Sequence, residues 1–112
     1  MNCQIEKFGR SNFWNGKGDN MGIKLHELKV QSRYFRDIKS GLKTFELRKM
    51  DRDYKVGDFL ELYEFEGNQF IGCLLVVRIT YILSNVPEYG LEDGYGILGI
   101  ALCDYGKVKK NF

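Results

Sequence analysis

The chain has 112 residues, of which 44% are hydrophobic and 14% aromatic, and its formal net charge is +2. This length suits one domain with a single core, and this composition excludes a disordered chain. So small a net charge does not imply wholesale nucleic-acid binding, and no apolar run approaches the roughly 20 residues that span a bilayer.

Three ranges divide the chain. Residues 1–20 contain glycines and asparagines without a sustained apolar period, and we expect a flexible N-terminal extension there. The folded domain is expected at 21–105, followed by a basic and frayed tail at 106–112. Met1 leads into a charged segment rather than an apolar one, so we expect no signal peptide, a cytoplasmic protein and no membrane partner.

The cysteines and the single histidine predict neither a disulfide framework nor a metal site. Cys3, Cys73 and Cys103 are widely spaced, and no Cys-x-x-Cys pair occurs. Zinc sites are built mainly from clustered Cys and His ligands, which this spacing does not offer. We therefore expect no metal and no cofactor, with Cys73 and Cys103 as small core residues.

The first predicted elements are a strand and a helix. Apolar residues alternate from Ile23 and predict a strand that ends near Gln31. Ser32 is expected to cap a short helix that runs to Ser40, and Gly41 is well placed to end it.

The stretch after Gly41 carries the strongest functional signal. Residues 44–48 are predicted to form a strand, in which alternate side chains face opposite ways. Thr44, Glu46 and Arg48 then share one face and stand outside or in a cleft. We expect Phe45 and Leu47, on the other face, to be buried.

The remaining predicted elements are mostly strands. We expect strands at 59–65, 71–83 and 94–102, a hairpin turn at Gly67-Asn68, and a loop at 84–94 with one helical turn. In the long strand, alternate residues from Ile71 to Leu83 are expected to share one apolar face. The predicted fold is mainly β (α+β): a small curled sheet or barrel of about five or six strands with one or two short helices.

Charge is unevenly distributed along the chain. Residues 24–55 contain ten Lys or Arg against five Asp or Glu, whereas residues 56–105 contain one basic residue, Arg78, against eight acids. This asymmetry indicates either a polarised surface or a scattered and solvated charge pattern.

The order of elements and one motif resemble the ASCH superfamily, whose members have the PUA-like pseudo-barrel fold. Its signature Gly-x-Lys-x-x-Glu-x-Arg is present as Gly41, Lys43, Glu46 and Arg48. The flanks resemble a branch of small bacterial and phage domains of unknown function, through His26-Glu27-Leu28-Lys29, the loop from Arg48 to Asp58, and Gly94-Tyr95. The resemblance covers roughly residues 23–102.

The resemblance implies binding of RNA or of a nucleotide in a cleft beside the signature. One related type of member is a small amidohydrolase that acts on an acylated nucleoside. It is similar around the lysine but has a threonine where this chain has Glu46. That member also uses a further glutamate from a later strand, and its counterpart in this chain is not assigned.

The residue types suit these roles. Lys43, Arg48 and Arg52 can contact phosphates, and Thr44 adds a hydroxyl. Glu46 can accept from a base or orient the cations. For catalysis, Lys43 and Glu46 are the candidates.

Three further residues are candidates for the site, and two of them, Tyr95 and His26, also have a structural interpretation. Tyr54 and Tyr95 can stack on a base, although we expect Tyr95 to pack in the core with Ile97. His26 can join the site, yet a lone histidine on an alternating strand is more often a partly buried structural residue.

Three hypotheses follow. In the first, the chain is an RNA- or nucleotide-binding module, and in the second it is a small amidohydrolase of modified nucleosides. In the third, it is a protein-interaction domain with a polarised surface. A monomer is the expected state.

Overall fold

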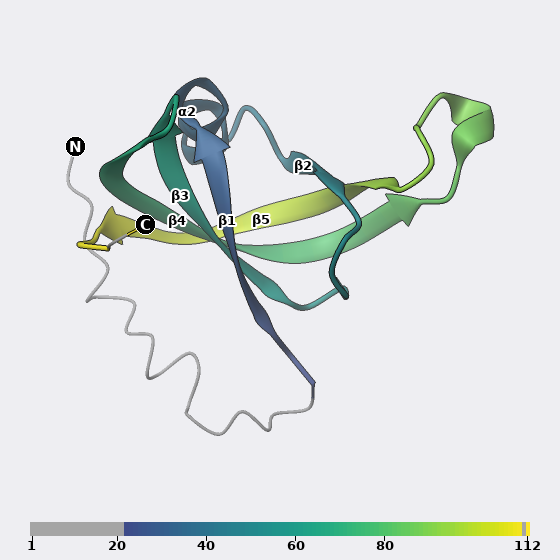
Figure 1. Ribbon diagram of the computed structural model, residues 1–112. Coiled ribbons are helices and arrows are strands. Elements are labelled where there is room, and N and C mark those ends of the chain that lie inside the picture. Colours follow the sequence, from purple (N-terminus) through teal and green to yellow (C-terminus); the bar gives the residue numbers. More distant parts are fainter. Residues whose placement is uncertain (1–21, 111) are drawn as a thin grey trace.

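The computed structural model describes residues 22–110 and residue 112 (Figure 1). The predicted extension at 1–20 lies outside this described part. In chain order the elements are β1 (Leu25–Gln31), α2 (Ser32–Lys39), β2 (Phe45–Lys49), β3 (Phe59–Glu66), β4 (Gln69–Ser84), the 3₁₀ helix η1 (Pro87–Tyr89) and β5 (Tyr95–Lys107). The prediction of a small, mainly β pseudo-barrel is confirmed.

The strands form one curled sheet in the order β1-β3-β4-β5-β2. β1 pairs with β3 in parallel, and the other neighbours are antiparallel. The β4–β5 register skips Thr80 and Cys103, and the β3–β4 register shifts between Tyr63 and Phe65; such bulges bend and twist a strand. In Figure 1 the long β4–β5 pair crosses the whole molecule, and the ribbon of β1 crosses this pair near its middle.

The helix α2 lies over β1 and β3. Phe35 and Ile38, three residues apart on its buried face, join the core. Gly41 has a φ of 86° and ends the helix as predicted, because a left-handed residue is needed there. The predicted cap was wrong: Ser32 Oγ donates to the Glu64 carboxylate, 2.8 Å away, and the N-cap residue is Gln31.

The main core fills the concave side of the sheet beneath α2. Its fully buried members come from every long strand: Leu60, Leu62, Leu75, Val77, Ile79 and Leu98. This burial of apolar surface supplies the main stabilisation of the fold.

The long strand β4 does not keep one apolar face, contrary to prediction. Ile79 is fully buried, but Thr80 bulges out of the pairing with β5. One extra residue reverses the alternation. Tyr81 and Leu83 therefore lie on the outer surface.

The C-terminal end also differs from the prediction. β5 extends to Lys107, and the backbone N–H of Val108 then donates to Gly72 O, 2.9 Å away. The ring of Phe112 lies 5.1 Å from those of Tyr63, Phe65 and Phe70. Val108 and Phe112 are therefore packed rather than frayed, because they cover a second apolar cluster on the β3–β4 hairpin.

Two smaller expectations about core residues also changed. Cys73 is partly buried against the main core, as predicted, but Cys103 is exposed beside its bulge. Tyr95 and Ile97 are half-buried on the outer face of β5, whereas Gly96 and Leu98 face inward. Tyr95 is therefore not a core residue.

Candidate functional site

Three residues of the sequence signature form one connected cluster, here called the Glu46 cluster: Lys43, Glu46 and Arg48. Lys43 Nζ donates to Glu46 Oε1 at 3.1 Å, and Arg48 Nε donates to Glu46 Oε2 at 2.9 Å. Glu46 is 5% exposed, so its charge is screened little by water. The two cations outnumber the carboxylate, and the cluster carries a net positive charge.

The register of β2 places this cluster inside the curl. Glu46 lies opposite Leu98 and Arg48 lies opposite Gly96, and both β5 residues face the core. Paired residues in an antiparallel sheet share a face. The prediction that Phe45 and Leu47 are buried was therefore wrong, because the polar face of β2 is the inner one.

Arginines from the β2 side reach across to the free edge of β1. Arg48 Nη2 donates to Lys29 O at 2.6 Å, and Arg52 Nη1 lies 3.4 Å from Glu27 O. Edge-strand carbonyls otherwise lack partners. These two residues therefore close the barrel as well as supplying positive charge.

A hollow of ≈ 320 Å³ opens beside the Glu46 cluster, between α2 and β2. Its lining combines a lysine and a carboxylate with apolar and aromatic groups: Tyr34, Lys43, Phe45, Glu46 and Leu47. Lys43 Nζ lies 4.6 Å from the centre of the Phe45 ring and 5.6 Å from that of Tyr34. The hollow can thus offer an ammonium group and two aromatic surfaces to one ligand.

Sequence reasoning missed Tyr34, Phe45 and Leu47 as lining residues. Alternation along 44–48 indicates two faces without saying which of them is buried. A useful signal was nevertheless present in Glu46 and Arg48, which are two residues apart and so share one face of the strand. Opposite charges at this spacing can form an ion pair, and a paired ion can be buried.

The other predicted residues lie away from this hollow. Thr44 is exposed and is not in the lining. Arg52 belongs to the barrel closure, and its neighbour Asp53 pairs with Lys55 on the surface. The hydrogen bond and charge of Lys55 lower the pKa of Asp53.

His26 and Tyr54 belong to a separate, sealed group, here called the Asp58 cluster: His26, Tyr54 and Asp58. Asp58 is 1% exposed and accepts from the backbone N–H groups of Lys24 and Lys55, both at 3.0 Å. His26 Nε2 lies 2.8 Å from Asp58 Oδ2, and its ring lies 4.8 Å from that of Tyr54. The burial predicted for His26 is confirmed.

Tyr54 is buried too deeply to stack on a ligand. It is 6% exposed, and burial raises its pKa. We assign the whole Asp58 cluster to the structure of the barrel.

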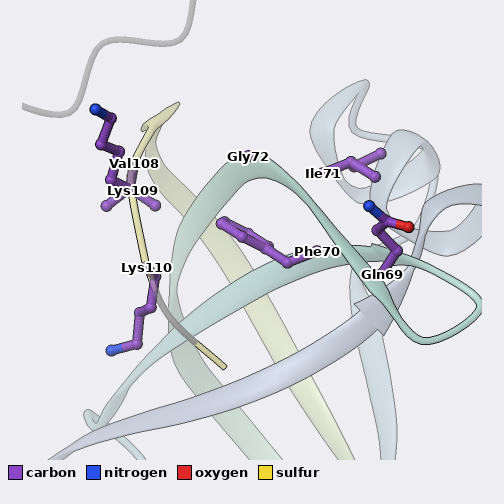
Figure 2. Close-up of a pocket in the computed structure, with 7 residues that line it drawn as sticks. All are labelled: Gln69, Phe70, Ile71, Gly72, Val108, Lys109 and Lys110. Carbon is purple, nitrogen blue, oxygen red and sulfur yellow. The ribbon is translucent and has the colours of Figure 1, made fainter.

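A larger hollow, ≈ 660 Å³, lies between the β3–β4 hairpin and the C-terminal segment. Figure 2 shows the Phe70 side chain pointing toward the C-terminal segment, while the side chains of Lys109 and Lys110 extend away from Phe70. Its lining includes no carboxylate and no converging polar pair. We favour the smaller hollow because charged groups converge there.

The described residues contain no group of three or more His, Cys, Asp or Glu side chains that could hold a metal ion. Within the same part of the chain, no helix has the length and apolar character needed to cross a membrane.

These features define a small curled-sheet domain with a cationic cluster and an aromatic hollow at one end. The chain belongs to the family described as a domain of unknown function, DUF3850, which matches residues 25–100. An uncharacterized 12.9 kDa protein in the GpA 3' region of Escherichia phage P2 is 42% identical over 73 residues. That match spans 65% of each chain.

Proposed function

We propose that this chain is an RNA- or nucleotide-binding module of the ASCH type, and that its site is the Glu46 cluster with the adjoining hollow. The observation that carries the proposal is the position of Lys43. Its side chain is 16% exposed, and its ammonium group lies between the Glu46 carboxylate and Phe45 O and near two aromatic rings.

Each part of a nucleotide has a complementary group in this arrangement. Lysine and arginine donors suit phosphate oxygens, and exposed aromatic rings suit bases. Glu46 keeps the two cations in place despite their mutual repulsion. The basic balance of residues 24–55 adds a favourable field around this end of the chain. We expect this binding to take place in the cytoplasm.

The direct test is fluorescence anisotropy with a labelled single-stranded RNA and with a labelled mononucleotide. We expect Lys43→Ala to weaken both by about tenfold, the loss expected for one charged hydrogen bond. The control is Lys55→Ala, which removes an exposed lysine outside the hollow. The affinity of the wild type should also fall as salt rises, because bound phosphate releases counterions.

Two results would contradict this proposal. One is an affinity that stays constant across the salt titration, and the other is an equal effect of the Lys43 and Lys55 variants. Lys43 already donates to two acceptors, which favours positioning over nucleophilic attack. Turnover of an acylated nucleoside, lost in Lys43→Ala, would instead establish the amidohydrolase alternative.

A further inference from the structure

The outer face of strands β2, β5 and β4 carries exposed apolar side chains in matched rows. In the first row, Phe45 lies opposite Gly99, which lies opposite Tyr81. Phe45 is 45% exposed and Tyr81 is 66% exposed. Two aromatic rings therefore stand on one sheet face, two strands or about 10 Å apart.

A second row runs parallel to the first and is also apolar. Leu47 lies opposite Ile97, which lies opposite Leu83. Leu47 and Leu83 are exposed and Ile97 is half-buried. We call the two rows together the outer face: Phe45, Leu47, Tyr81, Leu83, Ile97 and Gly99. An apolar surface that continues across three strands usually marks a contact site.

Gly99 keeps the space between the two rings open. A Cβ atom at this position would lie 3.0 Å from Thr80 Oγ1 and 3.3 Å from Tyr81 Cβ. With glycine there, no side chain rises between Phe45 and Tyr81. A flat ring can therefore lie against either aromatic residue.

Positive charge surrounds the outer face. Lys43 contacts the Phe45 ring, Lys49 lies opposite Tyr95, and Arg78 lies opposite Ala101 on the same side of the sheet. At the two rows and at the flanking pairs Lys49–Tyr95 and Arg78–Ala101, the register places no acidic residue on the outer side, and the nearest acid there, Asp104, lies one pair beyond Arg78, opposite Val76. The expected occupant is therefore anionic and has flat apolar surfaces.

We propose that the outer face receives the bases of a single-stranded RNA whose phosphate is held at the Glu46 cluster. This inference rests on the proposed function and extends its site, since Phe45 and Leu47 line the hollow and also belong to the outer face. Unpaired bases stack on aromatic side chains whatever their identity, whereas a duplex hides the faces of its bases. The chain therefore selects single strands and binds several nucleotides.

The test compares Tyr81→Ala with Tyr81→Phe in the full chain, with a labelled single-stranded oligonucleotide, a matched duplex and a labelled mononucleotide. Tyr89→Ala is the control, because Tyr89 is a highly exposed tyrosine on η1, outside the outer face. We expect Tyr81→Ala to weaken the oligonucleotide about tenfold, the loss of one stacked base. Tyr81→Phe, Tyr89→Ala and mononucleotide binding should remain as in the wild type.

The outcomes separate this inference from the proposed function. If Lys43→Ala weakens the oligonucleotide and Tyr81→Ala does not, the outer face is not part of the site although the chain binds RNA. If the duplex binds as tightly as the single strand, base stacking is likewise refuted. If the wild type binds neither RNA nor mononucleotide, the proposed function fails and this inference fails with it.

Sedimentation velocity of the same variants tests whether a second copy of this chain, rather than RNA, covers the outer face. A wild-type dimer that Tyr81→Ala dissociates, with unchanged RNA affinity, would assign the outer face to a second copy of this chain and overturn the inference. A monomer at all concentrations, with weakened RNA binding in Tyr81→Ala, would support it.

Discussion

Two buried carboxylates, Asp58 and Glu46, serve different ends in the same small barrel. Asp58 binds two backbone N–H groups and a histidine ring, all in a sealed environment. Glu46 is almost as well buried, but its partners are the long side chains of Lys43 and Arg48. Asp58 fixes the backbone, whereas Glu46 positions two cationic side chains beside an open hollow.

This difference shows how burial alone misleads about function. Both residues sit where an unpaired charge would be costly. The hydrogen-bond partners decide the role. A carboxylate whose oxygens already accept from backbone N–H groups has no free acceptor site for a ligand. A carboxylate that orients cations leaves their remaining donors free to bind one.

The largest expected effect is on stability. Asp58→Ala leaves the N–H groups of Lys24 and Lys55 and the His26 ring without their acceptor, and should lower the free energy of unfolding by about 3–5 kcal/mol. Urea denaturation measures this loss. Asp53→Ala, which removes an exposed acid, should leave it almost unchanged. A loss below about 1 kcal/mol in Asp58→Ala would contradict the assignment of the Asp58 cluster to the structure of the barrel.

Glu46→Gln should cost less, about 1–2 kcal/mol, because Lys43 and Arg48 can turn toward water when the charge is lost. The same denaturation experiment applies. The control is Glu27→Gln, whose carboxylate pairs with Lys110 at the surface and should matter little. If Glu46→Gln is as damaging as Asp58→Ala, the contrast between the two acids is false.

Arg48→Lys should cost about 1 kcal/mol, because an ammonium group cannot bridge Glu46 and Lys29 O as the guanidinium fork does. Arg52→Lys is the matched control, since Arg52 is more exposed than Arg48 and its bond to a β1 carbonyl, Glu27 O, is longer. Equal losses in the two variants would show that the fork of Arg48 has no special role in closing the barrel.

The smallest expected effect is an alkaline one, within the Asp58 cluster. Burial raises the pKa of Tyr54 above its usual 10.0. The unfolded chain then ionises first, so this contribution to stability is complete below pH 10 and is lost as the pH rises toward the folded pKa. Urea denaturation below and above pH 10 should show a steeper loss in wild type than in Tyr54→Phe. Parallel curves would indicate that Tyr54 ionises freely.

Much of the fold was predictable from local pattern. Alternation identified the strands, Gly67-Asn68 identified the hairpin, and Gly41 identified the end of the helix. The meeting of Lys43, Glu46 and Arg48 was predictable too, since alternate residues of a strand share a face and Lys43 immediately precedes them. All of these signals act over a few residues.

Three features were not predictable, and each depends on contacts between distant segments. The inner face of β2 is set by its register with β5, which places Glu46 opposite Leu98. The exposure of Tyr81 depends on the bulge at Thr80, which forms only when β4 pairs with β5. The packing of Phe112 needs the aromatic cluster of the β3–β4 hairpin to exist first.

By itself, then, the sequence determined the elements, the mainly β class and the set of charged residues that meet near Gly41, because propensity and periodicity are local properties. Only the tertiary structure decided which face of each strand points inward, because that choice depends on partners far along the chain. It thereby separated the sealed Asp58 cluster from the open Glu46 cluster, and it brought Phe45 and Tyr81 onto one outer face.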